Sequence, residues 1–267
     1  MEMSLNNTTS RTFYIPQNLL DGTIKIALVG VGSTGSSMLT ELFQLNGVLT
    51  KLGFDGLHVT AYDGDVVTPS NIYRQNFWAH DINLSKSEVS IKRLNQFGNV
   101  NWEYETRFFN QEDAKKCNFD ILITAVDKAS VRYEIGQALT EVPNKGLWLD
   151  LGNDNHRSNV LLGSLNKNGT GGVNRLPSPF ELFGGQWLES SKNENDTPSC
   201  STQEAIAKQT FGINGMTARS ASSMLLFPLL KHGELKHHGL FIDLHDADIS
   251  KMPVDPLQWS MYGYEEE

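Results

Sequence analysis

A glycine-rich turn between an apolar strand and a helix constrains the fold of this chain more than any other feature. Residues 24–30, IKIALVG, predict a buried strand, and the apolar spacing in SSMLTELFQLNGVL predicts a helix soon after it. Gly30, Gly32 and Gly35 stand between them in the spacing G-x-G-x-x-G. Such glycines permit a tight turn, a close approach of the backbone to a phosphate, and close packing of the helix on the strand. The turn therefore predicts nucleotide binding, although it serves NAD, FAD and ATP alike, and a turn without a ligand is the structural alternative.

Strands and helices alternate along the first part of the chain, which predicts an α/β fold with a doubly wound, mostly parallel, Rossmann-like sheet. Further strands are predicted at 57–65, 101–109, 119–127 and 146–153, and further helices at 86–97 and 130–139. Residues 169–199 are rich in Gly, Pro, Ser and Asn, which predicts a long crossover loop. A helix at 213–230 and a last strand and turn at 239–249 are expected after the loop.

Charge and composition exclude several classes of function. The net charge is −9 and no stretch clusters Lys and Arg, so direct binding to nucleic acid is disfavoured. The apolar run MLLFPLL is too short to span a bilayer, and the first fifteen residues lack the features of a signal peptide. We therefore expect a cytoplasmic protein without membrane contact. Two cysteines, Cys117 and Cys200, are too few for a disulfide framework or a four-cysteine zinc site, so no zinc is expected.

A second motif follows the second predicted strand. Residues 63–77, DGDVVTPSNIYRQNF, resemble the D-x-D-x-V-x-x-S-N-x-x-R-Q signature of the ThiF/MoeB family, the bacterial relatives of ubiquitin-activating enzymes. In the same order, LSKSEV resembles the family's G-x-x-K-x-E element and TAVDKASVRY its D-N-x-x-x-R-Y element. The resemblance implies an ATP-binding adenylation core at 24–160, after an N-terminal segment at 1–23. Residues 161–267 then hold the crossover loop, a helix, and the C-terminal sheet and tail of the same domain.

The resemblance also implies an activity, the ATP- and Mg²⁺-dependent adenylation of the C-terminal carboxylate of a small ubiquitin-like protein. Asp63 is then expected to hold the ribose of ATP. Asn71 and Arg74 are expected to contact the phosphates, and Lys86 to act on the α-phosphate as charge builds on it. Asp127, at the end of a parallel strand, is expected to hold Mg²⁺, because a hard cation prefers carboxylate oxygens.

Two residues of the motif match the family signature without a specific contact assigned to them. Gln75 is counted with the nucleotide-binding residues, and Asp65 has no assigned contact. Ordinary explanations also exist for single residues: Arg74 and Asp65 could form an exposed ion pair, and Lys86 could be a solvated side chain. Asp127 could be a helix N-cap.

Two competing functions stay open at this point. An NAD- or FAD-dependent oxidoreductase would use the glycine turn but gives no role to Arg74, Gln75 and Lys86. A nucleotide-binding scaffold without turnover would keep the same residues, and the sequence lacks none of the groups expected for catalysis.

The second half of the chain contributes a candidate nucleophile. Cys200 lies where ThiF-like members place the thiol that attacks the acyl-adenylate, and a thiolate suits that step because it is a strong nucleophile at a modest pKa. A cysteine without a chemical role is the alternative, and Cys117, just before an apolar strand, is expected to be structural. Family members form homodimers in which an N-terminal arginine reaches the partner's ATP, and Arg11 could take that role.

The tail KMPVDPLQWSMYGY narrows the family resemblance. Its Pro-Val-Asp-Pro and Trp ending resembles ThiF-related proteins of the PRTRC cassette, which also encodes a small ubiquitin-like protein. Pro253 and Pro256 are expected to stiffen an exposed tail, and Trp259, Tyr262 and Tyr264 offer area for docking a subunit or partner. Packing of these aromatic residues on their own domain is the alternative.

Overall fold

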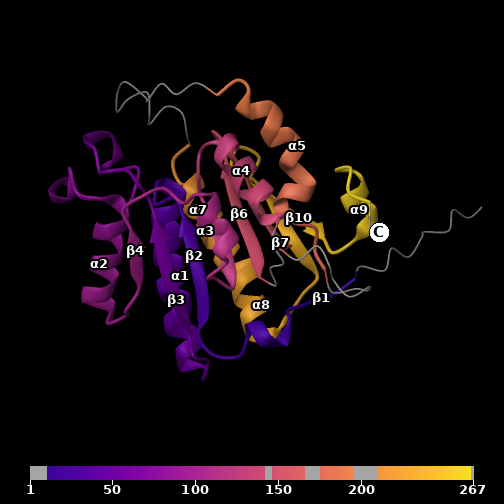
Figure 1. Ribbon diagram of the computed structural model, residues 1–267, viewed down its shortest axis with the longest axis horizontal. Coiled ribbons are helices and arrows are strands. Elements are labelled where there is room, and N and C mark those ends of the chain that lie inside the picture. The colour runs from indigo at the N-terminus through magenta and orange to yellow at the C-terminus, as the bar shows by residue number, and fades with distance from the viewer. Residues whose placement is uncertain (1–10, 142–145, 166–174, 195–209, 266–267) are drawn as a thin grey trace, which may run out of the picture.

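A sheet of eight strands forms the centre of the computed structural model, which describes residues 11–141, 146–165, 175–194 and 210–265 (Figure 1). The strand order is β10-β9-β7-β6-β5-β2-β3-β4. Its strands are β2 (Ile24–Val29), β3 (Leu57–Tyr62), β4 (Glu103–Glu105), β5 (Ile121–Thr124), β6 (Leu147–Asn153), β7 (Arg157–Ser164), β9 (His237–Asp243) and β10 (Asp248–Pro253). Strands β2 to β6 are parallel to their neighbours within this group, and β7, β9 and β10 extend the sheet in antiparallel pairing. The predicted doubly wound, mostly parallel sheet is confirmed.

Two hydrophobic cores lie on opposite faces of this sheet because neighbouring side chains of a strand point in opposite directions. On β2, Ile26 and Leu28 belong to one core, and Ala27 and Val29 to the other. Trp148 of β6 is fully buried in the second core. Strands buried on both faces explain why the sequence shows continuous apolar runs there.

Helices cover both faces of the sheet (Figure 1). They are α1 (Ser33–Lys51), α2 (Lys86–Gly98), α3 (Gln111–Lys116), α4 (Ala129–Leu139), α5 (Pro179–Ser191), α7 (Ile213–Ser220), α8 (Phe227–His232) and α9 (Pro256–Ser260). A π-helical stretch, η4 (Ala221–Leu226), joins α7 to α8, so the helix predicted at 213–230 is present. A small separate sheet pairs β1 (Phe13–Tyr14) with β8 (Glu234–Leu235). Within the described ranges, none of the helices has the length and apolar character needed to cross a membrane.

The prediction of a long crossover loop at 169–199 is wrong for the central part of that range. Helix α5 occupies Pro179–Ser191, where Ser178 accepts a hydrogen bond from the N–H of Glu181 and Glu181 accepts one from the N–H of Ser178. This capping box, with Pro179 in the first turn, is readable as S-P-F-E in the sequence. The many glycine and asparagine residues around this capping box led to the prediction of a loop, but the segment is a helix that packs on α4.

Of the two possibilities for the aromatic residues of the C-terminal tail, docking of a partner or packing on their own domain, the structure shows the packing, which the sequence favoured. The tail forms the edge strand β10, which pairs with β9, and then the helix α9. Trp259 is buried, and its indole N–H donates to Nε2 of His238 at 2.8 Å. Tyr264 packs edge to face on Trp259, and Tyr262 stacks on Phe241. The tail therefore packs on its own domain.

His238 is a fully buried imidazole that can only be neutral in this arrangement. Its Nδ1 bonds to the carbonyl oxygen of Leu162 at 2.7 Å and must donate there, while Nε2 accepts from Trp259. Burial lowers the pKa of His238 to about 4, while the hydrogen bond to the Leu162 carbonyl acts to raise it and His237 acts to lower it.

This buried histidine predicts acid sensitivity of the fold. The unfolded chain binds the proton with an ordinary pKa near 6.5, so the folded state loses stability as pH falls from about 6.5 to about 4. We expect the free energy of unfolding to be about 2 kcal/mol lower at pH 5 than at pH 7 from this group. Urea titrations should show a smaller difference in His238→Gln, and an unchanged difference in the exposed control His80→Gln. An equal difference in wild type and His238→Gln would contradict this assignment.

Candidate functional site

The glycine turn joins β2 to α1 at the carboxyl edge of the sheet. Gly30 has φ +89°, and a Cβ there would lie 2.8 Å from the carbonyl oxygen of Ala125. At Gly35 a Cβ would lie 1.9 Å from the carbonyl oxygen of Gly30, so only glycine lets α1 approach the strand this closely. Gly32 precedes the first turn of α1, and a Cβ there would meet no atom within 4 Å. The turn thus leaves open space at the positive end of a long helix.

Asp63 is a buried carboxylate that joins two loops of the site. Its Oδ2 atom accepts from the N–H of Val31 in the glycine turn at 2.6 Å, and its Oδ1 atom accepts from the N–H of Asp65 at 2.8 Å. Burial raises the pKa of Asp63, while the nearby Lys86 ammonium and the two N–H donors act in the opposite direction. Each carboxylate oxygen has a further lone pair, so the side chain can still accept a hydroxyl donor.

Asp65 pairs with Lys86, which the sequence did not predict. The Lys86 ammonium lies 2.9 Å from Oδ2 of Asp65, and the lysine side chain is only 9% exposed while the aspartate is 55% exposed. The backbone adds a second link, because the N–H of Lys86 donates to the carbonyl oxygen of Asp65. Lys86 is therefore a buried cation held by a partly exposed carboxylate, and the interpretations of Lys86 as solvated and of Asp65 as the partner of Arg74 are wrong.

The loop after β3 carries the other polar residues of the motif. Asn71 is buried, and its amide oxygen accepts from the N–H and the hydroxyl of Thr68. The carbonyl oxygen of Asn71 accepts from the N–H of Arg74 and of Gln75, which makes a tight turn. Because the side-chain oxygen of Asn71 is used in this turn, a contact from Asn71 to a phosphate would come from its NH₂ group.

Arg74, on the loop after β3, and Asp127, after β5, influence each other electrostatically at the carboxyl edge of the sheet. Burial lowers the pKa of the Arg74 guanidinium, and the Asp127 carboxylate works against this shift. Asp127 follows β5 and is exposed. The structure therefore brings a half-buried cation close to an exposed carboxylate, at the edge where the glycine turn and Asp63 also lie.

Two anchors hold the loop that carries Arg74. On one side, the amide of Asn76 donates to the carbonyl oxygen of Ser36 on α1 at 3.1 Å. On the other side, Arg93 of α2 binds both carboxylate oxygens of the fully buried Asp81 at 2.7 and 2.8 Å. The Arg93 guanidinium also lies 3.8 Å from the ring centre of Trp78. A neutral amide bond on one side and a charge-assisted pair with a buried carboxylate on the other fix the position of the loop.

Gln75 lines a cleft of about 760 Å³ between this loop, α1 and α2. Its Oε1 atom is buried and accepts no hydrogen bond within the described residues. A buried amide oxygen without a donor costs free energy, so a ligand or partner that supplies a donor would be bound favourably here.

The N-terminus of α4, directly after Asp127, is capped by a residue distant in the sequence. The carboxylate of Glu194 accepts from the N–H groups of Ala129 and Ser130 and from the Ser130 hydroxyl. Burial works to raise the pKa of Glu194, but these hydrogen bonds lower it below its usual range. The N-cap position is Lys128, so the interpretation of Asp127 as the cap is wrong and its carboxylate stays available to a ligand.

Arg132, the arginine of the TAVDKASVRY element, belongs to a buried hydrogen-bond network that links α4 to β5 and β6. Its Nε atom lies 2.8 Å from Oδ1 of Asp150 on β6, and both side chains are below 10% exposed. The same carboxylate oxygen accepts from the hydroxyl of Thr124 on β5, which in turn accepts from the indole of Trp148. No role could be assigned to Arg132 from the sequence, because its partner lies 18 residues away on another element.

The described residues include Cys117 and Asp127 but not the other predicted site residue of this group, Cys200. Cys200 lies outside the described residues. Cys117 follows α3 with φ +46°, and its thiol donates to the carbonyl oxygen of Ala114 at 2.7 Å, which fits the structural role expected for it. The described ranges contain no cluster of three or more His, Cys, Asp or Glu that could hold a metal. Asp127 alone matches the way Mg²⁺ binds to nucleotide enzymes, through one or two carboxylates and the phosphates.

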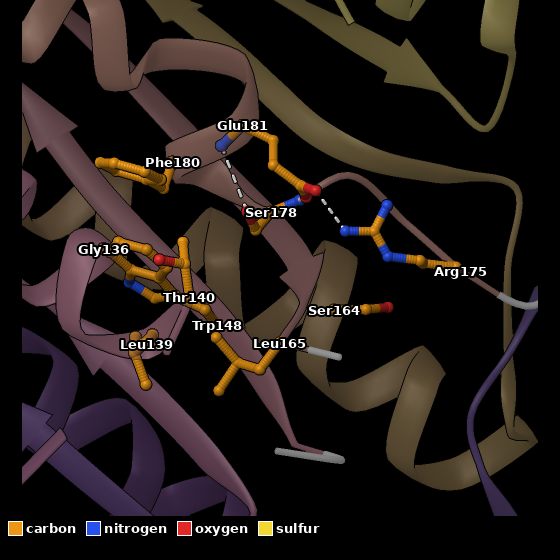
Figure 2. Close-up of a pocket in the computed structure, with 10 residues that line it drawn as sticks. All are labelled: Gly136, Leu139, Thr140, Trp148, Ser164, Leu165, Arg175, Ser178, Phe180 and Glu181. Carbon is orange, nitrogen blue, oxygen red and sulfur yellow. Dashed lines mark hydrogen bonds and ion pairs between the residues drawn. The ribbon is translucent and has the colours of Figure 1, made fainter. Parts of the chain in front are cut away.

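A second cavity is too small for a nucleotide. Figure 2 shows it between α4, α5 and β6, beside Trp148 and Phe180. Its volume is about 20 Å³, room for about one water molecule. Arg175 and Glu181 form an ion pair at its edge. The cavity is a packing gap away from the glycine turn.

Comparison with known proteins agrees with this geometry. The family model described as the ThiF family matches residues 17–257. No curated protein matches the sequence. Among solved structures, PaaA is similar with a TM-score of 0.58 and 14% identity, over 90% of this chain and 66% of PaaA. E. coli MccB with ATP is similar with a TM-score of 0.58 and 15% identity, over 90% of this chain and 65% of MccB.

A further solved structure, E. coli MccB with AMPCPP and MccA, has a TM-score of 0.59 and 14% identity, over 90% of this chain and 66% of MccB. The chain therefore spans slightly less than two thirds of the length of these neighbours. At such low identity the likeness shows a shared fold.

Proposed function

The chain belongs to the ThiF family, and on that premise we propose that it uses ATP to adenylate a substrate carboxylate. The observation that carries the proposal is the arrangement of two cations, Arg74 and Lys86, around the glycine turn and Asp127. An oxidoreductase that transfers hydride from NAD or FAD would need neither cation. Carboxylate activation with ATP needs both, because negative charge must be stabilised on the phosphates.

The proposed reaction joins the substrate to AMP. One oxygen of the substrate carboxylate attacks the α-phosphorus of ATP, a new P–O bond forms, and the bond between the α-phosphorus and the bridging oxygen breaks. Pyrophosphate leaves with the electron pair of that bond. No proton is transferred in this step, so catalysis comes from positioning and from charge stabilisation.

Each residue has a defined part in this proposal. Asp63 accepts the ribose hydroxyls, and the N-terminus of α1 with the glycine turn receives the phosphates. Arg74 stabilises charge on the phosphates during bond breaking, and Lys86 does so at the α-phosphate. Asn71 and Gln75 contribute amide groups from the same loop. Support comes from the position of all these residues at the carboxyl edge of the parallel strands, where open α/β sheets bind ligands.

The donor chemistry at Asp127 fits Mg²⁺. An exposed carboxylate opposite an arginine provides a hard oxygen ligand, and the phosphates of ATP would supply others. Bound Mg²⁺ would neutralise charge on the phosphates. Asp127 holds Mg²⁺ in this proposal. Asp65 holds the Lys86 ammonium in place and does not contact the metal ion.

The proposal is tested by exchange of labelled pyrophosphate into ATP in the presence of the carboxylate substrate. Exchange requires reversible formation of the adenylate, so observed exchange supports an adenylating enzyme. No exchange, together with intact ATP binding, supports a nucleotide-binding scaffold without turnover. Tight binding of NAD without binding of ATP would contradict both the adenylating enzyme and the ATP-binding scaffold, and would support an oxidoreductase.

We propose a small ubiquitin-like protein as the substrate. The support is the sequence signature at residues 63–77 and the PRTRC-like tail, and a neighbouring small open reading frame that ends in Gly-Gly or a similar tail would identify the protein to test. We also propose a homodimer in which Arg11 acts on the partner's ATP. Arg11 lies beside β1, and its N–H donates to the carbonyl oxygen of Val254.

Cys200 provides a prediction that separates adenylation from transfer. The adenylate forms at Arg74, Lys86 and Asp127, so Cys200→Ala should leave pyrophosphate exchange within about twofold of wild type. A covalent thioester with the small protein, visible on a non-reducing gel, should disappear in this variant because the nucleophile is missing. Cys117→Ala is the matched control and should keep the thioester. Loss of exchange in Cys200→Ala would show that this cysteine acts before transfer.

A further inference from the structure

Two N–H groups at the start of α4 are bound by a carboxylate from outside that helix. Glu194, which follows α5, accepts from the N–H groups of Ala129 and Ser130, and the Ser130 hydroxyl donates to the same carboxylate at 2.6 Å. The contact forms because α5 packs on α4 (Figure 1). The first N–H groups of a helix have no partner within the helix, so an acceptor must come from elsewhere. Glu194 is that acceptor for α4.

Asp127 lies two and three residues before the same N–H groups. Aspartate and asparagine side chains commonly accept from the backbone N–H two residues further on, because the side chain is short and the turn is local. In this chain Asn110, Asp243 and Asp255 each accept from the N–H two residues further on. At Asp127 the corresponding donor, together with the next one, is already bound to Glu194.

The orientation of the Asp127 carboxylate determines how readily a metal ion can bind it. A carboxylate that accepts from helix N–H groups has its oxygen atoms turned towards the backbone, and Mg²⁺ must compete with these charge-assisted hydrogen bonds. In the structure Asp127 is exposed and interacts electrostatically with Arg74. Because Glu194 binds the N–H groups, the Asp127 carboxylate is left for other partners.

We propose that Glu194 is a positioning residue, which keeps the Asp127 carboxylate available to Mg²⁺ by capping α4 in its place. This inference rests on the proposed function, because the metal ion at Asp127 belongs to that function. Glu194 itself contacts neither ATP nor Mg²⁺ and acts only through Asp127. Without Glu194, Asp127 turns to cap α4, and Mg²⁺ binds only after that cap is broken.

The stability of the full chain without nucleotide or metal ion reports whether Asp127 caps α4. In the wild-type background, Asp127→Ala should change the folding equilibrium constant by less than about twofold, because Glu194 remains the cap. In the Glu194→Ala background, Asp127→Ala should lower that constant about fivefold, the usual effect of losing a helix cap. Urea unfolding of the wild type, the two single variants and the double variant measures both effects. Equal effects of Asp127→Ala in the two backgrounds overturn the inference.

The affinity for ATP with and without Mg²⁺, measured by calorimetry, reports the consequence for the metal ion. Glu194→Ala should weaken binding of ATP about tenfold in the presence of Mg²⁺ and leave binding without Mg²⁺ unchanged. Glu194→Gln removes the same charge but keeps an oxygen that accepts from N–H groups, so it should stay within about threefold of wild type. Glu189→Ala is the matched control, since Glu189 is an exposed carboxylate of α5 paired with Lys192, and it should bind ATP normally.

The two Glu194 variants separate positioning from simple attraction of the metal ion by charge. Equal weakening in Glu194→Ala and Glu194→Gln would show that the charge of Glu194 attracts Mg²⁺, and would overturn the inference. Unchanged binding in Glu194→Ala would overturn it as well. In both cases wild-type binding of ATP that depends on Mg²⁺ leaves the proposed function standing. Wild-type binding of ATP that is the same with and without Mg²⁺ would remove the proposed metal site at Asp127 and this inference together.

Discussion

Replacing Arg74 with alanine should lower the rate of adenylate formation by about 10³-fold. The guanidinium is half buried, and burial already lowers its pKa, so it works in a medium where charge interactions are strong. Its loop is fixed by the bond from Asn76 to Ser36 of α1 and by the pair of Asp81 with Arg93 of α2, so the charge is in place before the phosphates arrive. Preorganised charge of this kind stabilises a transition state without further rearrangement.

The measurement is pyrophosphate exchange with the proposed ubiquitin-like protein as substrate, with ATP binding measured in parallel. A loss in the exchange rate larger than the loss in ATP affinity indicates a contact made mainly in the transition state. Arg157→Ala is the control, because Arg157 is exposed and paired with Asp243 on the antiparallel part of the sheet. A reduction of less than tenfold in Arg74→Ala would contradict the role given to this arginine.

The part of the site that could be predicted from sequence is the part that depends on local signals. The strand, the turn with Gly30 and Gly35, and helix α1 follow one another in the sequence, so the glycine spacing is recognisable there, although the close contact of Gly30 is with the distant Ala125. The same holds for α2, which begins at Lys86. Local patterns therefore placed the glycine turn between a strand and a helix and predicted the helix at Lys86, whereas the assignment of Lys86 to the site came from the family resemblance.

The partners of the charged residues could not be predicted in the same way. Asp65 meets Lys86 because a single bridge joins Val66 to Ser85, and no local pattern encodes that pairing. Glu194 reaches the N-terminus of α4 across 65 residues. Side-chain pairing depends on where the elements pack, and packing is decided by the whole fold.

Two secondary-structure errors have a different cause. Helix α5 has a readable capping box, but the glycine, serine and asparagine content around it outweighed that signal. Strand β10 is exposed on most of its length and carries polar residues, so it lacks the apolar alternation of a half-buried strand. An edge strand with such a pattern cannot be distinguished from an irregular tail by its sequence, and only its pairing with β9 identifies it.

The largest effect on stability is expected at Arg132, on the buried network beneath the site. Arg132→Met should lower the free energy of unfolding by about 3–5 kcal/mol, because it leaves the Asp150 carboxylate buried without its cation. Thr124 would still donate to Asp150, but a hydroxyl does not compensate a full charge. The carbonyl oxygen of Leu151 would also lose the guanidinium donor at 3.0 Å.

Two further variants separate the charge effect from the loss of packing. In Arg132→Met with Asp150→Asn, the neutral amide oxygen can still accept from Thr124 and no buried charge remains, so at least half of the lost stability should return. Arg157→Met removes an arginine with the same 2.8 Å contact to a carboxylate, but on a side chain that is 65% exposed, and should cost less than about 1 kcal/mol. Urea unfolding of all three variants measures these differences. If Arg132→Met and Arg157→Met cost the same, burial does not determine the strength of the Arg132–Asp150 pair, and the support that this network gives to β5, β6 and α4 must come from packing instead.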